Sequence, residues 1–473
     1  MAQCARDLLR VRRVVPQVGR ARPRGARRRR RRGCRRRCCG RRRCARRNPD
    51  RSCRDPAYRR ARSMIGEMTD PEPAFRWRSI VAPALLPTLL FTIGEGAIIP
   101  LIPSLAARVG ADLAVAGLVA ALLLVGQLIG DLPAGWIVAR VGERAAMLGA
   151  LGAAGLGIAI AALAPSVALL GLGMLVLGAA AAVFALARHA LLTTAVPAAY
   201  RARALSTLGG VFRLGLMIGP FLGAAIITVT GETGAVYWLA IGALVGVAAC
   251  LVLLPDPEGL LLRDRDVERA PVSPLDVLRT IGARRDVLAR LGLAALTVSA
   301  LRASRQVLLP LWAVSIGLGD AQTATIIGAT AAVDFTLFYL GGWLMDRFGR
   351  LYTAVPSTLG LGLGFIVLAL STGADDPVAW FIGVAVGLAL SNGIGAGILM
   401  TMGSDLAGRT DPALFLGAWR LILDAGGAGA PLLVAGLTAA FSLAVGAGVL
   451  GALGLVGAGM LAWMIPRYLP RDR

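Results

Sequence analysis

From Ile80 onward the chain alternates long apolar stretches with short polar joints. An α-helix rises about 1.5 Å per residue, so each stretch can cross a hydrocarbon core of about 30 Å. The pattern predicts twelve membrane-spanning helices, at residues 80–106, 112–138, 145–164, 166–188, 205–229, 234–254, 287–316, 322–345, 351–371, 377–403, 412–440 and 442–466. Prolines inside them, such as Pro100 and Pro220, predict kinks. We therefore expect an all-α membrane protein.

Landmarks of the first six helices recur in the last six at a constant interval of 207 residues. The segment Gly135–Gly142 returns as Gly342–Gly349, and Arg213 returns as Arg420. The same interval separates Pro103 from Pro310 and Gly110 from Gly317. A duplication of this length in an apolar chain is typical of a transporter. The repeat predicts two pseudo-symmetric six-helix halves.

The rest of the chain divides around these halves. We expect an arginine-rich, low-complexity tail at 1–75, the first half at 80–254, a cytoplasmic linker at 255–286, the second half at 287–466 and a C-terminus at 467–473. The linker is the one long hydrophilic joint, and it falls between the sixth and seventh helices. That is where an architecture of two halves needs its connection.

Composition agrees with a membrane protein, because 56% of the 473 residues are hydrophobic and the mean hydropathy is +0.69. The formal net charge of +24 belongs almost entirely to the tail. Residues 1–78 hold 28 of the 51 basic residues and only six acidic ones. The helical body is therefore close to neutral, and the charge of the whole chain says little about its function.

The tail is open to three interpretations. Its arginines, including the run Arg27–Arg32, suit an arm that binds anionic lipid or one that binds nucleic acid. In the third interpretation, translation starts at Met64 or Met68, and the preceding mixture of Arg, Ala, Cys and Pro is GC-rich DNA read upstream of the gene. We favour the third and expect no nucleic-acid partner. The tail cysteines fit no zinc-binding pattern, so we expect no metal.

Arginine is concentrated in every second joint, and this bias predicts the orientation in the membrane. The joints after helices 2, 4, 6, 8 and 10 are basic, whereas the opposite joints carry Glu232, Asp320, Asp375 and Asp376, with Arg108 as their one arginine. Both termini are therefore expected in the cytoplasm. The chain has no lysine, a bias typical of a high-GC bacterium. We expect a multi-pass protein of the bacterial cytoplasmic membrane.

Ionisable residues inside the predicted helices are the main functional candidates, because a charge at mid-bilayer is costly. Glu95 in helix 1 and Arg302 in helix 7 are 207 residues apart, so these opposite charges could face each other between the halves. A buried carboxylate that binds and releases a proton can couple transport to protons, which makes Glu95 and Asp334 candidate proton sites. Candidate substrate contacts are Arg302, Arg305, Asn392, Arg213, Arg420 and Asp424. Alternatively, these charges form structural ion pairs that hold the halves together.

The loops after helices 2 and 8 carry the repeated glycine–arginine motif. Its second copy reads G-W-L-M-D-R-F-G-R from Gly342 to Arg350. Together with twelve helices and a long central linker, this resembles the major facilitator superfamily over residues 80–466. The resemblance implies two halves that rock in alternating access, with these loops as gate latches. The gating residues are Gly135, Arg140, Gly142, Arg144, Gly342, Asp346, Arg347, Gly349 and Arg350.

The two copies of the motif differ in charge. Ala139 stands at the acidic position of the first copy, where the second has Asp346. Charge pairing at the first latch is therefore weaker or uses Asp131, about two turns earlier. The glycines are expected to let two helices and a tight turn approach closely. The alternative is that the arginines serve only as anchors at the membrane surface.

A segment of helix 5 resembles the antiporter motif of the same family, which is associated with proton-driven export. Its residues are Gly215, Gly219, Pro220 and Gly223. The alternative is that these glycines serve close helix packing alone. A helix-4 arginine that such exporters carry is replaced here by Met174. This departure speaks against a standard drug–proton antiporter.

The residues and the resemblance together predict a secondary active transporter that exports a small organic solute against proton entry. The alternatives are an importer or facilitator of a metabolite and a membrane receptor or scaffold that transports nothing. We expect no enzyme activity and no cofactor. The expected partners are the lipid bilayer, a small solute and protons, and we expect a monomer.

Overall fold

The computed structural model of the chain describes residues 85–196, 198–253, 282–283, 285–407 and 412–468. All of them belong to one compact unit, Arg76–Arg473. The predicted tail at 1–75, most of the predicted linker and residues 469–473 lie outside the described residues. The part that is described is built from helices and contains no strand.

Twelve of the described helices are long and apolar enough to span a membrane, which confirms the predicted number. In the first half they are formed by α4 (Leu86–Ile98) with η3 (Ile99–Leu101) and α5 (Ile102–Arg108), α6 (Leu113–Val141), α7 (Glu143–Ala162), α8 (Val167–Ala195), α9 (Ala198–Thr230) and α10 (Ala235–Leu253). In the second half they are formed by α13 (Arg285–Val287) with η5 (Leu288–Gly292) and α14 (Leu293–Ser315), α15 (Asp320–Phe348), α16 (Leu351–Leu370), α17 (Pro377–Ile394) with α18 (Ile398–Ala407), α19 (Pro412–Ala440) and α20 (Leu443–Tyr468).

Glycines end equivalent helices of the two halves in the same way. Gly142 follows α6 with a φ of 84°, and Gly349 follows α15 with a φ of 92°. Gly110 and Gly317, which follow the first helix of each half, also have positive φ. Residues with a Cβ avoid this left-handed region, so glycine is the residue that allows these tight turns. The 207-residue repeat is thus present in the backbone as well as in the sequence.

The first spanning helix is interrupted at Pro100, as the sequence predicts. The α-helical hydrogen bonding changes there to the short 3₁₀ turn η3. Proline lacks an N–H and clashes with the preceding turn, which accounts for the break. Pro220, in contrast, lies inside the continuous helix α9. The break separates the segment that carries Glu95 from the segment that ends at Arg108.

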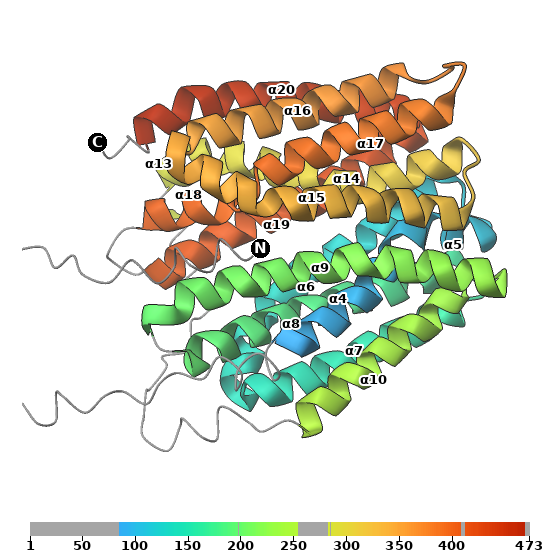
Figure 1. Ribbon diagram of the computed structural model, residues 1–473, viewed down its shortest axis with the longest axis horizontal. Helices are drawn as coiled ribbons and strands as arrows, with labels where there is room; N and C mark the ends of the chain where they lie inside the picture. Colours follow the sequence, from blue (N-terminus) through green and yellow to red (C-terminus); the bar gives the residue numbers. More distant parts are fainter. Residues whose placement is uncertain (1–84, 197, 254–281, 284, 408–411, 469–473) are drawn as a thin grey trace, which may run out of the picture. The chain divides into compact units, whose positions relative to one another are not determined.

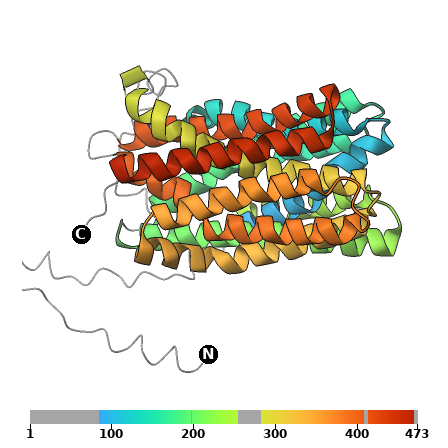
Figure 2. The same cartoon turned by 90° about the horizontal axis from the view of Figure 1, so that it is seen from above.

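Each half packs its own helices together, and two helix pairs form the most extensive contacts between the halves. Within the halves, α6 packs on α8 and α4 on α9, while α15 packs on α17 and α14 on α19. Between the halves, α9 packs on α15 and α6 on α19 (Figures 1 and 2). These two contacts are symmetry-related, because they join the fifth helix of one half to the second helix of the other.

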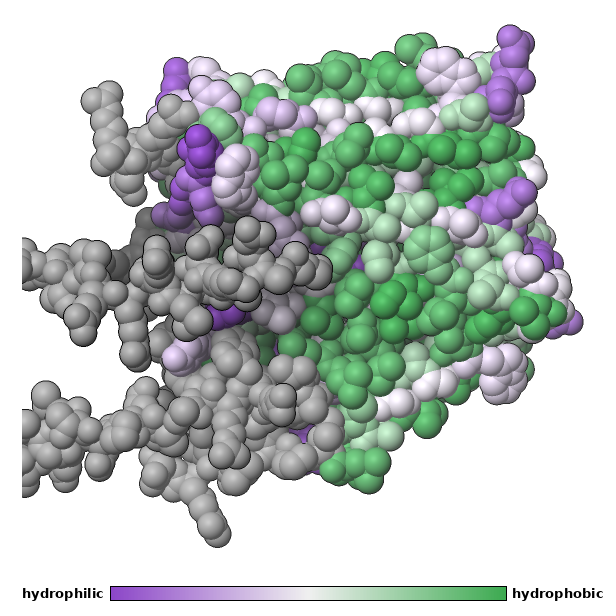
Figure 3. All heavy atoms as spheres, in the orientation of Figure 1, coloured by the Kyte–Doolittle hydropathy of each residue, from purple (hydrophilic) through white to green (hydrophobic). Residues whose placement is uncertain are grey.

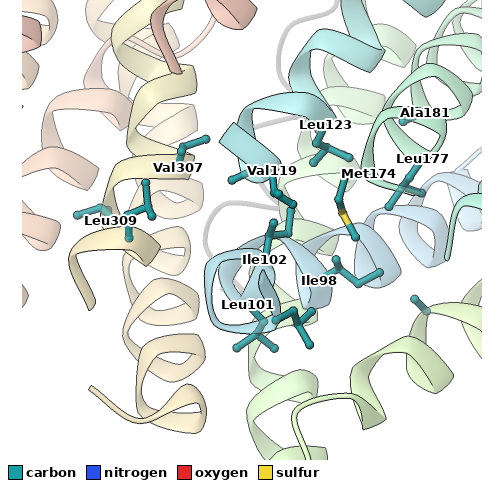
Figure 4. Close-up of a cluster of buried hydrophobic side chains, with 14 of the residues drawn as sticks. Ile98, Leu101, Ile102, Val119, Leu123, Met174, Leu177, Ala181, Val307 and Leu309 are labelled. Atoms are coloured by element: carbon teal, nitrogen blue, oxygen red, sulfur yellow. The ribbon is translucent and has the colours of Figure 1, made fainter. Parts of the chain in front are cut away.

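The largest core cluster is apolar and includes buried residues of both halves. Figure 4 shows part of it, where Ile98, Leu101 and Ile102 lie among residues of α6 and α8, with Val307 and Leu309 of α14 nearby. Apolar residues also cover much of the side of the helix bundle seen in Figure 3, and hydrophilic residues gather towards its ends. This distribution suits a body surrounded by lipid.

Candidate functional site

Asp334, near the middle of α15, is the centre of one buried polar cluster. Its Oδ2 accepts hydrogen bonds from Asn392 Nδ2 of α17 at 2.7 Å and from Arg305 Nη2 of α14 at 3.1 Å. Its Oδ1 accepts from Arg213 Nη1 of α9 at 3.3 Å. Arg213 belongs to the first half and the other three residues to the second. Four residues that the sequence singled out separately therefore form one site across the interface.

Arg302 extends this cluster along α14, one turn before Arg305. Its Nη2 donates to the carbonyl oxygen of Gly395 at 2.5 Å. Its guanidinium interacts electrostatically with Asp334 and also with two like charges, Arg213 and Arg305. We call Arg213, Arg302, Arg305, Asp334 and Asn392 the Asp334 cluster. It contains three cations and one anion.

Glu95 lies in a second cluster, within the first half. Gln127 Nε2 of α6 donates to Glu95 Oε1 at 3.3 Å, and Arg188 of α8 interacts with Glu95 electrostatically. Glu95 also borders a small cavity whose other lining residues come from α4, α7, α8 and α10. Glu95 and Arg302, whose opposite charges could face each other between the halves, form no hydrogen bond or ion pair with each other among the described residues. Each of the two residues finds its hydrogen-bond partner in its own half.

Arg188 is the site residue that the sequence reading missed. Only 5% of its surface is exposed, and its guanidinium lies 5.0 Å from the ring centre of Phe212. The predicted helix ended at residue 188, whereas α8 continues to Ala195, so Arg188 lies inside the helix. The apolar residues Ala190, Leu191 and Leu192, which directly follow it and His189, could have indicated this continuation.

A third cluster joins the halves between α6 and α19. Arg420 Nη2 bonds to Asp131 Oδ1 at 2.9 Å, and Arg420 Nε bonds to Asp424 Oδ2 at 3.3 Å. The carboxylates of Asp131 and Asp424 share one guanidinium and interact with each other electrostatically as like charges. Asp131 therefore does not take the place of the missing acid near Ala139. It pairs with an arginine of the opposite half.

The clusters occupy positions related by the 207-residue repeat, but their chemistry differs. Gln127 is equivalent to Asp334, and Arg188 to Gly395. Asp131 is equivalent to Phe338, whose ring lies 4.9 Å from the guanidinium of Arg213. Of these three pairs of equivalent positions, only Gln127 and Asp334 are polar in both halves. The Asp334 cluster has three arginines to one carboxylate, the Glu95 cluster has one of each, and the third cluster has one arginine to two carboxylates.

The gating motif keeps one cation in both copies, Arg140 and Arg347, whereas Glu143 stands in the first copy where the second has Arg350. Arg140 lies over the ring of Trp136 at 5.2 Å, and Arg347 over the equivalent Trp343 at 5.5 Å. Of the expected roles for its glycines, the tight turn holds for Gly142 and Gly349. Close helix approach does not hold for Gly135 and Gly342, because a Cβ at 342 would meet nothing within 4 Å and one at 135 only Leu186 at 3.9 Å.

The arginines that end the two motif copies have different partners. Arg350 Nε bonds to Asp405 Oδ2 at 2.9 Å, so its carboxylate partner comes from α18, whereas Asp346 of the motif itself is exposed. In the first copy, Arg144 donates to the carbonyl oxygen of Val252 at 3.2 Å. Charge pairing at the second loop is therefore supplied by a residue outside the motif.

The helix-5 motif packs α9 against α4. A Cβ on Gly219 would lie 2.7 Å from the backbone nitrogen of Ala97, and one on Gly215 would lie 2.8 Å from Thr92 Cβ. Gly223 has room, since its Cβ would meet Ala97 atoms at 3.5 Å or more. Pro220 follows Gly219 within the same helix. The motif thus holds helix 5 directly against the helix that carries Glu95.

A polar contact joins the halves at the end of the bundle opposite the gating motif. Arg108 Nη2, at the end of α5, bonds to Asp320 Oδ2, at the start of α15, at 3.2 Å. The Thr233 hydroxyl accepts a hydrogen bond from Arg108 and donates one to Asp320. The one arginine of these joints is therefore used to bridge the halves.

Twelve apolar helices in two similar halves, with buried charges shared between them, define a membrane transporter rather than an enzyme. The family profile described as Major Facilitator Superfamily matches residues 84–431. The chain belongs to this family.

Solved structures with a similar fold are transporters of low sequence identity. A POT family transporter in complex with a thioalcohol conjugated peptide is 12% identical, with a TM-score of 0.66, over 82% of this chain and 96% of that chain. The xylose transporter XylE from E. coli, in an inward open conformation, is 16% identical, with a TM-score of 0.63, over 83% of this chain and 96% of that chain. No curated protein sequence matches the chain.

Proposed function

We propose that this chain is a proton-coupled secondary active transporter that exports a small organic solute by alternating access. The observation that carries the proposal is that ion pairs with largely enclosed carboxylates link the halves, Arg213 with Asp334 and Arg420 with Asp131. Movement of the halves against each other must break or rearrange these pairs. Their strength depends on protonation and on any charged ligand nearby, so proton and solute can both bias the movement.

Glu95 is our first candidate for the proton site. It is 9% exposed and lies in a span otherwise rich in apolar residues. Its hydrogen bond comes from the neutral amide of Gln127 and uses one carboxylate oxygen. The other oxygen can take a proton without breaking that bond. The neighbouring charge of Arg188 ties the protonation state to the position of α8.

Asp334 is a weaker candidate than the sequence suggested. Protonation would disturb hydrogen bonds from Arg213, Arg305 and Asn392 at once. Asp131 and Asp424 suit proton binding better, because two carboxylates there face a single guanidinium, Arg420, and a proton would relieve the excess negative charge. We therefore place Asp334 among the residues that bind solute and join the halves, and Asp131 with Asp424 as the second proton site.

Proteoliposomes that enclose a pH-sensitive dye test proton coupling. We expect a sugar, amino acid, dipeptide or organic acid from a panel to cause saturable proton movement through the wild-type protein. Glu95→Gln should reduce this movement at least tenfold while leaving exchange of solute across the membrane. Glu232→Gln, the same change at an exposed residue, should behave as wild type. If Glu95→Gln moves protons as well as wild type, Glu95 is not the proton site.

The direction of solute transport is tested by imposing a pH gradient of known sign across the membrane. In an exporter, protons moving inward drive solute outward, so an inward-directed gradient should lower the solute concentration on the cytoplasmic side. The resemblance of the Gly215–Gly223 segment to an antiporter motif supports export. Accumulation under the same gradient would favour the importer alternative. That alternative has its own support, because Met174, where exporters carry an arginine, is fully buried among apolar residues.

A further inference from the structure

The Asp334 cluster has more positive charge than its acid can balance. Arg213, Arg302 and Arg305 interact electrostatically with one another and with a single carboxylate, Asp334. Within the described residues, Arg213 and Arg305 share this one carboxylate and Arg302 forms no ion pair, so the cluster carries two more positive charges than negative ones. Since a charge inside a membrane protein is normally paired, this surplus calls for an anion.

Hydrogen bonding indicates the same deficit. In the described part of the chain, Arg302 Nε and Arg305 Nη1 are buried without a hydrogen-bond partner. Both residues lie one turn apart on α14, on the side where Asp334 and Gly395 lie. Buried donors in folded proteins almost always have a partner, and a guanidinium is suited to bind two oxygens of one oxyanion.

The position of these groups matches a ligand site rather than a static core. Arg213 comes from the first half, while Arg302 and Arg305 come from the second, so the cluster lies at the interface between them. The Arg213 and Arg305 side chains are 23% and 13% exposed, so neither is fully enclosed by protein. A ligand bound here would contact both of the bodies that must move.

We propose that Arg302 and Arg305, with Arg213 opposite them, bind an oxyanion group, a carboxylate or a phosphate, of the transported solute. The proposal rests on the transport function proposed above and adds the class of the substrate. The bound oxyanion competes with Asp334 for the guanidinium groups of Arg213 and Arg305. It therefore weakens the pair that joins α9 to α15, and solute binding is coupled to the movement of the halves.

Thermal unfolding of the purified protein in detergent, followed by intrinsic fluorescence, tests the site. The probes are succinate and inorganic phosphate, with succinamide as the uncharged analogue and sodium chloride at matched ionic strength. We expect a saturable rise in Tm with at least one of the two anions and none with succinamide or chloride. No saturable rise with either anion overturns the proposal.

Substitutions in the Asp334 cluster test whether the anion binds there. Arg302→Gln should raise the half-saturating anion concentration at least tenfold, because a charge-assisted bond is worth about 1.5–3 kcal/mol. Arg302→Lys keeps the charge and should restore part of the affinity, which guards against a variant that simply folds poorly. Arg467→Gln, at an exposed residue of α20, should bind as wild type. Equal binding by Arg302→Gln and wild type also overturns the proposal.

This test and the test of proton coupling can fail independently. Anion binding in detergent needs no membrane and no pH gradient. Proton movement driven by a neutral solute, without anion binding, would contradict the substrate class and leave the transporter intact. Anion binding without any coupled proton movement would contradict proton coupling and leave the anion site intact.

Discussion

Arg213 and Arg420 occupy equivalent positions in the two halves, and each forms an ion pair with a carboxylate of the opposite half. Arg213 bonds to Asp334 of α15, and Arg420 bonds to Asp131 of α6. The carboxylates are not equivalent, because Asp131 corresponds to Phe338 and Asp334 to Gln127. These two ion pairs between the halves therefore resemble each other in geometry, but the charged residues around them differ, so each pair can be tested separately.

Removing the charge of Asp334 should strongly destabilise the protein. Asp334→Asn removes the carboxylate that pairs with both Arg213 and Arg305. Breaking a buried pair of this kind costs about 3–5 kcal/mol. Chemical or thermal unfolding in detergent should show a large loss for Asp334→Asn and almost none for Asp346→Asn, the same change at an exposed position of the same helix. Equal stability of the two variants would contradict the role of Asp334 as the centre of the cluster.

The two carboxylates on Arg420 predict a pH dependence. Asp131 and Asp424 share this one guanidinium, so their like charges repel when both are ionised, and Tm should fall as the pH rises. Asp424→Asn leaves a single carboxylate on Arg420 and should flatten this dependence. Asp405→Asn, which removes a carboxylate from the Arg350 pair, serves as the control. An unchanged pH profile in Asp424→Asn would argue against repulsion between the two carboxylates.

The helix-5 motif predicts different tolerance at two neighbouring glycines. Gly219→Ala places a methyl group against the backbone of α4 and should cost about 1–3 kcal/mol from overpacking. Gly223→Ala, one turn later, meets only ordinary contacts and should be close to neutral. Unfolding measurements on the two variants provide the comparison. If both are neutral, close packing is not the reason for the motif.

The contact of Arg108 with Asp320 predicts a change in how the halves separate. Arg108→Gln removes the ion pair and weakens the link to Thr233, so the halves should part more often at this end. Spin labels attached to cysteines introduced at the exposed residues Ala107 and Gln322, with other reactive cysteines removed, would report this separation. The distance between the labels is measured by double electron–electron resonance. We expect a new population at longer distance in Arg108→Gln and none in Glu232→Gln. A distance distribution that is identical in all three proteins would rule out a latch.

Most of the fold could be predicted from local patterns. Long apolar stretches fix the number of helices, and glycines such as Gly142 and Gly349 end them where the backbone requires a positive φ. The sequence predicts the ends of the helices less well, and one such end affects the candidate site. Ending helix 4 at residue 188 instead of Ala195 removed Arg188 from consideration, although it is one of the most buried charges described.

The candidate site was only partly predictable. Each residue of the Asp334 cluster can be recognised from the sequence, because a polar or charged side chain inside an apolar helix is energetically costly in a membrane. The partner of each side chain depends on how the helices pack. Glu95 and Arg302 have opposite charges at equivalent positions, but they bond to Gln127 and Gly395 respectively. No local pattern carries that information, since the partners are between 32 and 93 residues apart.

The amino-acid sequence by itself determined the twelve helices, the two halves and the depth at which charges lie, because these follow from apolar runs and the 207-residue repeat. Only the tertiary structure decided which charges share a cluster. The packing of α9 on α15 and of α6 on α19 places Arg213 beside Asp334 and Arg420 beside Asp131. A duplicated sequence sets equivalent positions, but the contacts between its copies exist only once the chain is folded.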